Sequence, residues 1–303
     1  MMPDSRIQKE FDRLLKSSKR QNWYHKYEVV KGSGVYTPGS VDTSYHAPRL
    51  NNLGLSPDFF KGKRVIDIGA ATGALTFYLE DLGAEVVAVD VWDPDTNGFN
   101  IVHKIRKSKV EHRIASVYDL NPVDFGYFDV VAFFGVFYHL KHPLLAFERV
   151  NSILKKGGIC IGSGTSSHRW FHNDDESCEQ GVDFEKITAE RINDSDILNV
   201  KSLNELALCG FSPVQFFRDK TNWFIPNREC LNGWLRASGF EVDKIIESSS
   251  SINRDWNKKK LTRSALSFNA HKIGEPVDEY SSPNFRPYVI PTYFELMRAK
   301  KGE

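Results

Sequence analysis

The sequence predicts an α/β protein built on a mostly parallel sheet with helices on both faces. Short apolar runs typical of buried strands alternate with helical patterns along the middle of the chain. One run, at residues 64–68, passes through a turn of small residues into a helix and then into a second buried run, which is the pattern of a βαβ unit. Repetition of this alternation places the strands in one parallel sheet. The 303 residues, 41% of them hydrophobic, suffice for a large buried core.

Residues 1–60 are expected to form a helix and an aromatic lid. Apolar side chains recur at a helical spacing between residues 7 and 19, which predicts an amphipathic helix. The stretch from Trp23 to Gly39 combines aromatic residues with glycine and proline, so it is too irregular for a long helix and too apolar for disorder. Such a stretch suits a lid or a pocket wall.

Residues 61–164 carry the regular pattern and form the predicted core. Strands are predicted at 64–68, 85–89, 114–117, 129–134 and 158–163, and helices at 74–82 and 143–154. Most of these strands read as continuous apolar runs, as expected where helices cover both faces of a sheet.

The rest of the chain is predicted to elaborate and complete the core. The periodicity weakens over residues 165–222, apart from a short helical pattern at 202–209, and we expect an insertion over the carboxyl edge of the sheet that shapes a substrate pocket. Residues 223–273 return to the core with a helix at 227–238 and two β-like runs that form a terminal hairpin. The tail at 274–303 contains four prolines and is predicted to cross the surface as a strap.

Composition limits the partners and the compartment. Forty basic against 39 acidic side chains leave a formal charge of +1, so no overall field attracts nucleic acid or an anionic membrane. The four cysteines lie far apart without C-x-x-C spacing, which argues against a zinc site, and no metal is expected. No apolar stretch is long enough for a bilayer, so we expect a cytoplasmic protein without a membrane partner. A local basic patch remains available at Lys104, Arg106, Lys107 and Lys109. The oligomeric state stays open.

The sharpest local signal is the sequence VIDIGAATG, which ends at Gly73. A buried strand runs here into a turn of small residues, and small residues let the backbone approach a ligand closely. Asp90 closes the next strand 21 positions after Gly69, where a carboxylate can accept hydrogen bonds from both ribose hydroxyls of an adenosine. The pattern therefore predicts a nucleotide-type site, and its spacing fits NAD as well as S-adenosylmethionine.

Two details favour S-adenosylmethionine. Dinucleotide sites use G-x-G-x-x-G to seat a pyrophosphate at the helix N-terminus, whereas this turn carries Gly69, Ala71 and Gly73 at alternate positions after Asp67 and so lacks that spacing. The Asp67 carboxylate would repel a pyrophosphate and attract the ammonium and sulfonium of S-adenosylmethionine.

The segment from Asp67 to Gly73 resembles motif I of class I S-adenosylmethionine-dependent methyltransferases, and Asp90 resembles their ribose-binding acid. The resemblance implies a Rossmann-like fold with a seven-stranded sheet, and S-adenosylhomocysteine as the product. Ala71 replaces the usual middle glycine, but alanine keeps the turn small. Matching positions place four further residues at the cofactor: Val117 and Tyr118 beside the adenine, and Phe134 and Gly135 beneath the methionine moiety.

The acceptor side has a signal of its own. Tyr138, His139 and His142 lie just beyond the predicted strand at 129–134, at the edge where open α/β sheets bind ligands. This segment resembles the methyltransferases that modify the tRNA wobble uridine, those that form 5-methoxyuridine or its carboxymethyl counterpart, and their small-molecule relatives. Stretches at 23–25, 39–43, 224–240 and 263–265 extend the resemblance over most of residues 20–272.

The same resemblance implies roles for other side chains. Tyr138 and Arg263 would face the methyl donor or acceptor, and the segment that ends at Tyr45 would cover the cofactor. The carboxymethyl-transferring branch carries tryptophan and lysines upstream for its extra carboxylate, whereas this chain has Tyr45 and Arg49 there and no lysine close behind. Ordinary methyl transfer is therefore expected.

The expected chemistry is an in-line displacement at the methyl carbon, in which alignment of the acceptor supplies most of the acceleration. A hydroxyl acceptor loses its proton as the bond forms, and histidine is the usual base. His139 is the first candidate and His25 the second, although a histidine after a strand also serves as a structural donor to a backbone carbonyl. Three functions stay open: O-methylation of a small molecule, methylation of 5-hydroxyuridine in tRNA, and a non-catalytic module that binds S-adenosylmethionine.

Overall fold

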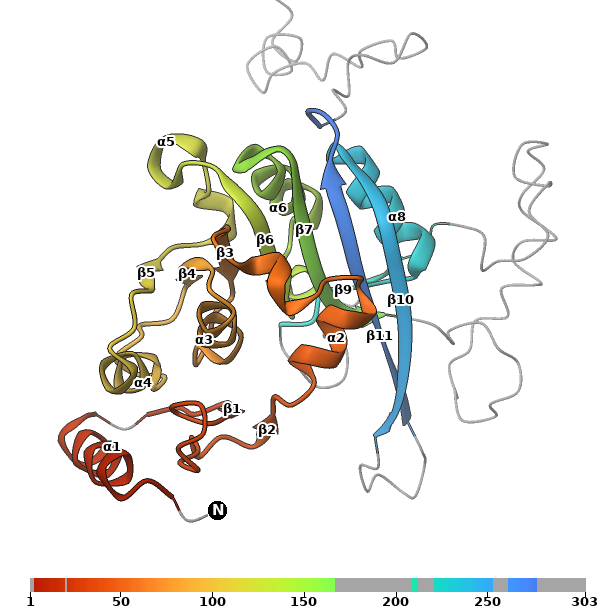
Figure 1. Cartoon of the computed structure of the whole chain (residues 1–303). Coiled ribbons are helices and arrows are strands. Elements are labelled where there is room, and N and C mark those ends of the chain that lie inside the picture. Colours follow the sequence, from red (N-terminus) through yellow and green to blue (C-terminus); the bar gives the residue numbers. More distant parts are fainter. Residues whose placement is uncertain are drawn as a thin grey trace, which may run out of the picture.

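A seven-stranded sheet forms the centre of the protein (Figure 1). The computed structural model describes residues 3–19, 21–166, 207, 209–211, 221–252 and 261–276, with the backbone alone at 249–252 and 261–264. In spatial order the strands are β10 (Phe240–Ile252), β11 (Leu261–Lys272), β7 (Leu154–Ser166), β6 (Phe128–Phe134), β3 (Arg64–Ile68), β4 (Glu85–Asp90) and β5 (Glu111–Ile114). Within this sheet β11 pairs antiparallel with both of its neighbours, and the remaining pairs are parallel. The predicted mostly parallel, seven-stranded architecture is confirmed.

Helices cover both faces of this sheet. The α-helices are α1 (Ser5–Ser17), α2 (His46–Asn52), α3 (Ala74–Asp81), α4 (Phe99–Arg106), α5 (Pro122–Phe125), α6 (Pro143–Ser152) and α8 (Arg228–Ala237). On one face Ile66 and its neighbours pack with residues of α6 and α8, such as Phe147 and Leu235. On the other face Val65 packs with residues of α2, α3 and α4, such as Phe77. Because consecutive strand residues point to opposite faces, burial on both sides produces the continuous apolar runs of the sequence.

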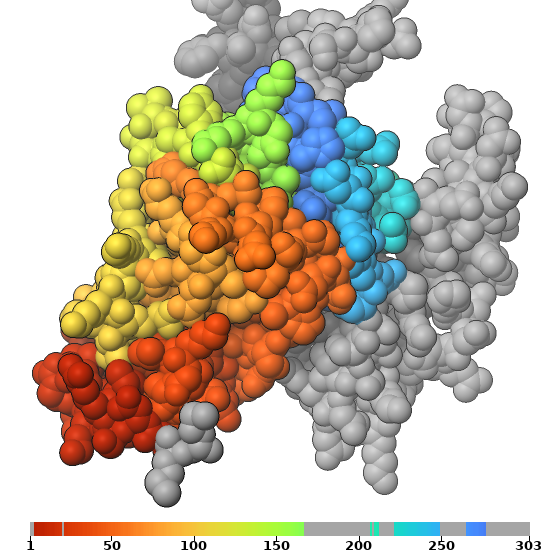
Figure 2. Space-filling model, viewed as in Figure 1, coloured from red at the N-terminus to blue at the C-terminus, as the bar shows by residue number. Residues whose placement is uncertain are grey.

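The first 60 residues lie along the α3–α4 side of the core. The Asp4 carboxylate caps α1 by accepting from the backbone N–H groups of Arg6 and Ile7, and Phe11 of α1 is buried against the Trp23 ring at 5.9 Å. Two-residue strands β1 (His25–Lys26) and β2 (Val41–Asp42) pair in parallel. In Figure 2 this red-to-orange segment forms a continuous surface with the core.

One predicted strand is wrong. The sequence placed a strand at 114–117, but β5 occupies Glu111–Ile114, and Val117–Asp119 form a 3-10 turn, η2, capped by the Ser116 hydroxyl. Since β5 is an edge strand that pairs with β4 alone, its side chains are half-exposed and need not be apolar. The apolar signal therefore fell on the residues that follow it.

The carboxyl-terminal part completes the sheet. β10 and β11 form the predicted hairpin, and Asn227 caps α8 by accepting from the backbone N–H of Cys230 at 2.9 Å. Two short strands, β8 (Cys209–Phe211) and β9 (Phe224–Pro226), pair antiparallel. The helix predicted at 202–209 lies largely outside the described residues, and Cys209 belongs to a strand. Most of the predicted insertion and of the strap at 274–303 lies outside them too.

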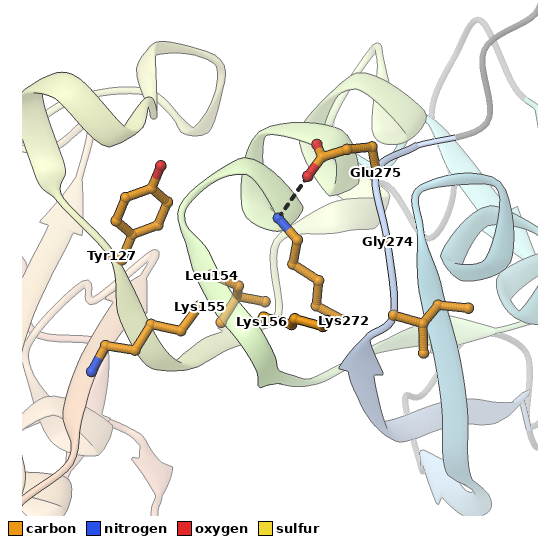
Figure 3. Close-up of a pocket in the computed structure, with 8 residues that line it drawn as sticks. Tyr127, Leu154, Lys155, Lys156, Lys272, Gly274 and Glu275 are labelled. Carbon is orange, nitrogen blue, oxygen red and sulfur yellow. Dashed lines mark ion pairs between the residues drawn. The ribbon is translucent and has the colours of Figure 1, made fainter.

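A shallow hollow of about 590 Å³ opens at the edge of the sheet where β6 and β7 begin (Figure 3). Its lining includes Tyr127, Lys156 and Ile273. Lys155, also in the lining, pairs with Asp129 at 2.8 Å, and Lys272 pairs with Glu275 at 3.2 Å. This hollow lies at the amino ends of the parallel strands, away from the glycine turn. Across the described ranges, no helix has both the length and the apolar character that crossing a bilayer requires.

Candidate functional site at the carboxyl edge of the sheet

The predicted glycine turn leaves β3 where the chain reverses direction across the sheet. The neighbours of β3 are β4 and β6, so the carboxyl ends of β3 and β6 border the crevice in which open α/β sheets bind ligands. Gly69 has a φ of 80°, and a Cβ there would lie 2.5 Å from Cγ2 of Val136, which follows β6. Ala71 also has a positive φ, 47°, a conformation that costs a residue with a side chain some strain. The turn ends at Gly73, which begins α3.

Asp90 holds this turn from the end of β4. Its Oδ2 accepts a hydrogen bond from the backbone N–H of Ala71 at 2.7 Å, and its Oδ1 accepts from the N–H of Trp92 at 2.9 Å. The residue is 8% exposed. Each carboxylate oxygen keeps a further lone pair for a ligand hydroxyl, which fits the predicted contact with a ribose.

Asn97 holds Ala71 by its carbonyl, whereas Asp90 holds it by its N–H. Asn97 was not identified from the sequence. Its amide donates to the Ala71 carbonyl at 2.7 Å, while its Oδ1 accepts from the N–H of Phe99 at the start of α4. The side chain is buried. Both backbone polar groups of Ala71 are therefore fixed by side chains, one at the end of β4 and one after it. The available signal was an asparagine before Gly98, a residue type that favours helix starts.

Asp67 lies beneath the turn at the end of β3 and is 3% exposed. The Thr76 hydroxyl in α3 donates to its Oδ2 at 2.6 Å. Burial raises the pKa of Asp67 to about 7; the Thr76 hydrogen bond opposes the rise, and the negative charge of Asp90 adds to it. A nearby cation would reverse this balance because it favours the ionised carboxylate.

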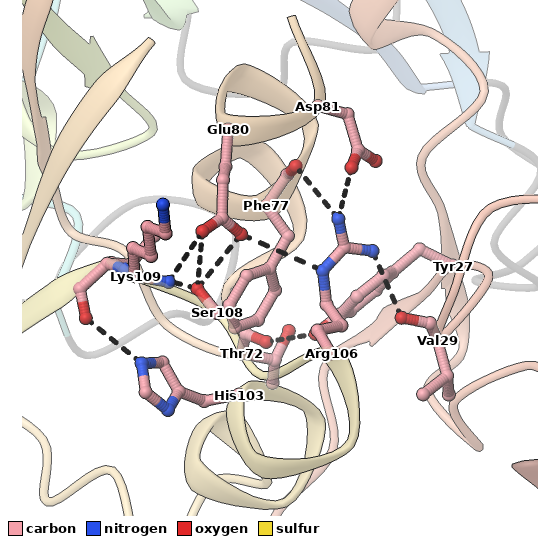
Figure 4. Close-up of polar contacts among 11 residues, drawn as sticks. Tyr27, Val29, Thr72, Phe77, Glu80, Asp81, His103, Arg106, Ser108 and Lys109 are labelled. Atoms are coloured by element: carbon pink, nitrogen blue, oxygen red, sulfur yellow. Dashed lines mark hydrogen bonds and ion pairs between the residues drawn. The ribbon is translucent and has the colours of Figure 1, made fainter. Parts of the chain in front are cut away.

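The aromatic lid is fastened to Thr72 of the turn by two hydrogen bonds. The Tyr27 hydroxyl donates to the Thr72 carbonyl at 2.5 Å, and Nδ1 of His25 lies 2.8 Å from the Thr72 hydroxyl (Figure 4 draws the Tyr27 bond). Burial lowers the pKa of His25 to about 4 and raises that of Tyr27. Both side chains are thus neutral near pH 7.

Arg49 of α2 brings a positive charge to the same edge. Its Cζ lies 4.4 Å from the ring centre of Tyr45 and 5.5 Å from that of Phe134, the last residue of β6. Burial lowers the pKa of Arg49, while Tyr45 and Tyr138 oppose this effect, yet a guanidinium stays charged in a protein. No carboxylate among the described residues forms an ion pair with it. Beside it, Nε2 of His46 is buried without a hydrogen-bond partner in the described part of the chain.

The segment after β6 carries the predicted acceptor-side residues. Gly135 has a φ of 75° and leads into a 3-10 turn, η3, at Phe137–His139. Tyr138 is 8% exposed and lies near Arg49, since the two interact electrostatically. Nδ1 of His139 lies 2.9 Å from the Thr221 hydroxyl. Arg263 belongs to β11, but its side chain is outside the described residues.

The two residues predicted to lie beside the adenine have structural contacts of their own. Val117 is 5% exposed and packs in the core, and the Tyr118 hydroxyl accepts from the backbone N–H of His142 at 3.1 Å. Directly after Asp90, Val91 and Trp92 are 63% and 47% exposed. Large apolar side chains beside Asp90 offer a surface on which a flat ring can lie.

The basic patch expected at residues 104–109 is only partly a surface. Arg106 has a side chain that is 9% exposed; it donates to the Val29 carbonyl at 3.1 Å and pairs with Asp81 and Glu80 of α3 (Figure 4). It clamps the lid segment and two helices together. Lys104, Lys107 and Lys109 remain exposed.

Known proteins resemble this chain in sequence. A family model described as "Methyltransferase domain" matches residues 45–245. The tRNA U34 carboxymethyltransferase of Syntrophotalea carbinolica is 22% identical over 191 residues, which cover 62% of this chain and 48% of that protein. The ubiquinone biosynthesis O-methyltransferase of Xanthomonas campestris pv. campestris is 35% identical over 98 residues, 32% of this chain and 41% of that protein. The chain thus spans about half the length of these curated relatives, or less.

Among solved structures, a putative S-adenosylmethionine-dependent methyltransferase from Listeria monocytogenes is 17% identical, with a TM-score of 0.49, over 75% of this chain and 98% of that one. The family match is the stronger finding, because it extends over more than half of the chain and includes the glycine turn, Asp90 and the end of β6. With the sheet order and the geometry of the turn, it shows that this chain belongs to the methyltransferase-domain family of class I, S-adenosylmethionine-dependent methyltransferases.

Proposed function

We propose that this protein transfers the methyl group of S-adenosylmethionine to a hydroxyl group of a small molecule. One observation carries the proposal: charges complementary to both ends of this cofactor flank the crevice between β3 and β6. Asp90 presents a carboxylate on the β4 side, for ribose hydroxyls, and Arg49 presents a guanidinium beside Phe134 on the β6 side, for the carboxylate of the methionine moiety. The two opposite charges suit the two ends of one extended ligand.

Other residues would complete the cofactor site. The backbone of Gly69, Ala71 and Gly73 lines the turn, Asp67 lies beneath it, and Phe134 with Gly135 borders the methionine end. Tyr45 stacks on Arg49 and helps to hold it. On the adenine side, Tyr118 accompanies the exposed Val91 and Trp92, whereas Val117 would act through its backbone because its side chain is buried.

The bound cofactor supplies an electrophilic methyl group; the protein orients the acceptor and removes its proton. We assign the proton-accepting role to His139, whose ring is oriented by Thr221 at 2.9 Å and lies beside Tyr138. His25 is a weaker candidate: a pKa of about 4 makes it a poor base near pH 7, and its Nδ1 is engaged with Thr72. We therefore give His25 a positioning role. Arg263 keeps its proposed place near the donor or acceptor on the resemblance alone.

Three observations favour a small acceptor. The crevice is bordered by aromatic side chains, Tyr45, Phe134 and Tyr138, which suit a flat organic molecule. Arg106, the central member of the expected basic patch, is buried in ion pairs and unavailable to a nucleic-acid backbone. The Xanthomonas relative named above is itself an O-methyltransferase of ubiquinone biosynthesis.

The alternative acceptor is 5-hydroxyuridine at the tRNA wobble position. It is supported by the breadth of one match: the tRNA U34 carboxymethyltransferase of Desulforapulum autotrophicum is 20% identical over 78% of this chain and 59% of its own length. Exposed Lys104, Lys107 and Lys109 would then contact phosphates. A third possibility, a module that binds the cofactor without catalysis, predicts binding and no turnover with any acceptor.

The first experiment is calorimetric titration of the purified protein with S-adenosylmethionine and S-adenosylhomocysteine, with NAD as the control ligand. Saturable binding of the first two and none of NAD supports the cofactor assignment. The second experiment supplies methyl-labelled S-adenosylmethionine with either a panel of phenols and other hydroxylated metabolites or tRNA bearing 5-hydroxyuridine. Label in a small molecule supports the proposal, label in tRNA supports the alternative, and binding without transfer to either supports the non-catalytic module.

A further inference from the structure

We infer that Cys209 and Cys230 form a reversible intramolecular disulfide that fastens β8 to α8 beside the acceptor-side segment. The inference is independent of the methyl acceptor, because it rests on two thiols that none of the cofactor or acceptor contacts uses. The two cysteines are separated by 21 positions in the sequence, without a motif that would pair them.

The strand pairing brings the two residues together. In the β8–β9 pair Cys209 lies opposite Pro226. The chain then passes through Asn227, the N-cap of α8, and Cys230 lies in the first turn of that helix. The two thiol groups interact there. Both ends of the contact are fixed by regular structure, a condition that disulfide geometry requires.

The environment of the pair favours thiol chemistry. The Cys209 thiol donates to the Gly210 carbonyl at 3.7 Å. The interaction between the two thiols lowers the pKa of Cys230 and raises that of Cys209. The first turn of a helix also stabilises a thiolate. Cys209 is exposed, whereas Cys230 is 7% exposed, so solvent reaches the pair from the Cys209 side. Cys160 offers a contrast, since it is fully buried in β7 and burial raises its pKa.

The oxidant required is a low-molecular-weight disulfide, such as oxidised glutathione. The Cys230 thiol, whose pKa is lowered, loses its proton to solvent, its sulfur attacks the oxidant, and a mixed disulfide forms as one oxidant thiolate leaves. The Cys209 thiol then loses its proton and attacks the sulfur of Cys230, the protein disulfide forms, and the second oxidant thiolate leaves. The two cysteines lose two electrons and two protons in total, and the oxidant is reduced to two thiols.

The tether would act on the segment that orients His139. The backbone N–H of Trp223, just before β9, donates to the Tyr138 carbonyl at 3.0 Å, and Thr221 contacts His139 at 2.9 Å. Fastening β8 to α8 also fixes β9 between them. Oxidation is therefore expected to stabilise the acceptor-side segment and to leave the Asp90 end of the site unchanged.

The test uses the full chain, equilibrated in glutathione buffers from fully reducing to fully oxidising, quenched in acid and alkylated before peptide mass spectrometry. The expected result is loss of two alkylatable thiols, a linked peptide pair containing Cys209 and Cys230, and its reversal by dithiothreitol. The melting temperature of the oxidised protein should exceed that of the reduced protein by several degrees. Cys209→Ser should abolish the link and the melting shift, whereas Cys178→Ser, the matched control, should preserve both.

Two results would overturn the inference. In one, Cys209 and Cys230 remain alkylatable in the most oxidising buffer while circular dichroism shows a folded protein. In the other, Cys209 links to Cys178 instead of Cys230. The unsubstituted chain and Cys209→Ser, which changes an exposed residue, are enough to test the disulfide even if Cys230→Ser does not fold. Neither result affects cofactor binding, so failure here is distinguishable from failure of the proposed function.

Discussion

The carboxylate of Asp90 accepts the backbone N–H of Ala71 at 2.7 Å, so the acid at the end of β4 holds the turn that follows β3. Asn97 accounts for the other polar group of Ala71, its carbonyl. The acid predicted to bind ribose thus has a second task, keeping a strained alanine at a φ of 47° in a turn where glycine is usual. On the proposed function, cofactor binding and the shape of the turn depend on the same carboxylate.

Removal of that carboxylate should weaken cofactor binding. We expect Asp90→Ala to lower the affinity for S-adenosylmethionine by about 1.5–3 kcal/mol, because charge-assisted hydrogen bonds are lost and the turn loses its anchor. Calorimetric titration measures the change. Asp58→Ala, which removes an exposed acid from the 3-10 turn at Pro57–Phe60, is the control and should bind normally. Equal affinities of the two variants would contradict the role of Asp90.

Arg49→Gln should remove the contact with the methionine carboxylate. The expected loss of affinity for S-adenosylmethionine is roughly 10- to 100-fold, since a hydrogen-bonded charge is replaced by a neutral amide. Decarboxylated S-adenosylmethionine separates this role from a role in acceptor binding: the natural chain should prefer the carboxylated form, and the variant should bind both alike. Arg149→Gln, an exposed arginine of α6, is the control. A preference that persists in Arg49→Gln would refute the assignment.

Asp67 should make folding and cofactor binding depend on pH in opposite directions. Its pKa is raised from 3.8 to about 7, so between these values the unfolded chain has lost a proton that the folded chain keeps. The contribution of Asp67 to stability is therefore complete below about pH 4 and falls, by an amount on the order of a few kcal/mol, as the pH rises to about 7. Denaturant unfolding of the natural chain and of Asp67→Asn across this range measures the difference.

The cationic cofactor reverses the preference, because it favours the ionised carboxylate. Affinity for S-adenosylmethionine should therefore increase as the pH rises through about 7, and Asp67→Asn should flatten this dependence. A variant whose stability and affinity follow the same pH curves as the natural chain would show that Asp67 does not titrate in this range.

Arg106 should matter for stability rather than for acceptor binding. Its replacement by leucine leaves Asp81 and Glu80 without their cation and the Val29 carbonyl without its donor, and the expected cost is about 3 kcal/mol of the free energy of unfolding. Chemical denaturation measures the loss. Lys104→Ala removes an exposed neighbour in α4 and should change stability by less than about 0.5 kcal/mol. A comparable loss of stability in the Arg106 and Lys104 variants would contradict the view that Arg106 holds the lid segment and the two helices together.

His139→Ala should slow methyl transfer roughly 10²- to 10⁴-fold, the range of general-base catalysis, while the affinity for S-adenosylmethionine stays constant. The decrease in rate at low pH, which reports the protonation of the base, should disappear in the variant. His142→Ala tests specificity, because His142 is an exposed neighbour whose side chain does not cap α6. If turnover survives in His139→Ala with its pH profile unchanged, the proton leaves by another route.

The sequence predicted the sheet where burial was complete and failed where it was partial. The bounds of β3, 64–68, were predicted to the residue, because Val65, Ile66 and Ile68 form the short apolar run expected of a strand that is covered on both faces. β5 was displaced because an edge strand carries polar residues such as Arg113. α4 was not predicted. Glycine usually interrupts a helical pattern, but Gly98, with a φ of 86°, is the N-cap of α4.

Within the site, the local part was predictable and the long-range part was not. The turn and Asp90 form one βαβ unit, whose spacing is visible in the sequence. Asn97 and Arg49 act by reaching Ala71 and Phe134, which lie 26 and 85 positions away. No local pattern encodes such an approach. Burial of Arg106 was equally invisible, because its partners Asp81 and Glu80 belong to a different helix.

The two hydrogen bonds from the lid to Thr72 tie the N-terminal segment to the glycine turn. A fragment that began at β3 would carry the whole glycine turn, yet the carbonyl and hydroxyl of Thr72 would be bare to water. It would also lack Arg49, to which we assign one of the two charges that face the cofactor. On the proposed function, the smallest unit able to hold the cofactor is therefore longer than the sheet, and grafting this site onto another scaffold would mean transplanting a discontinuous surface.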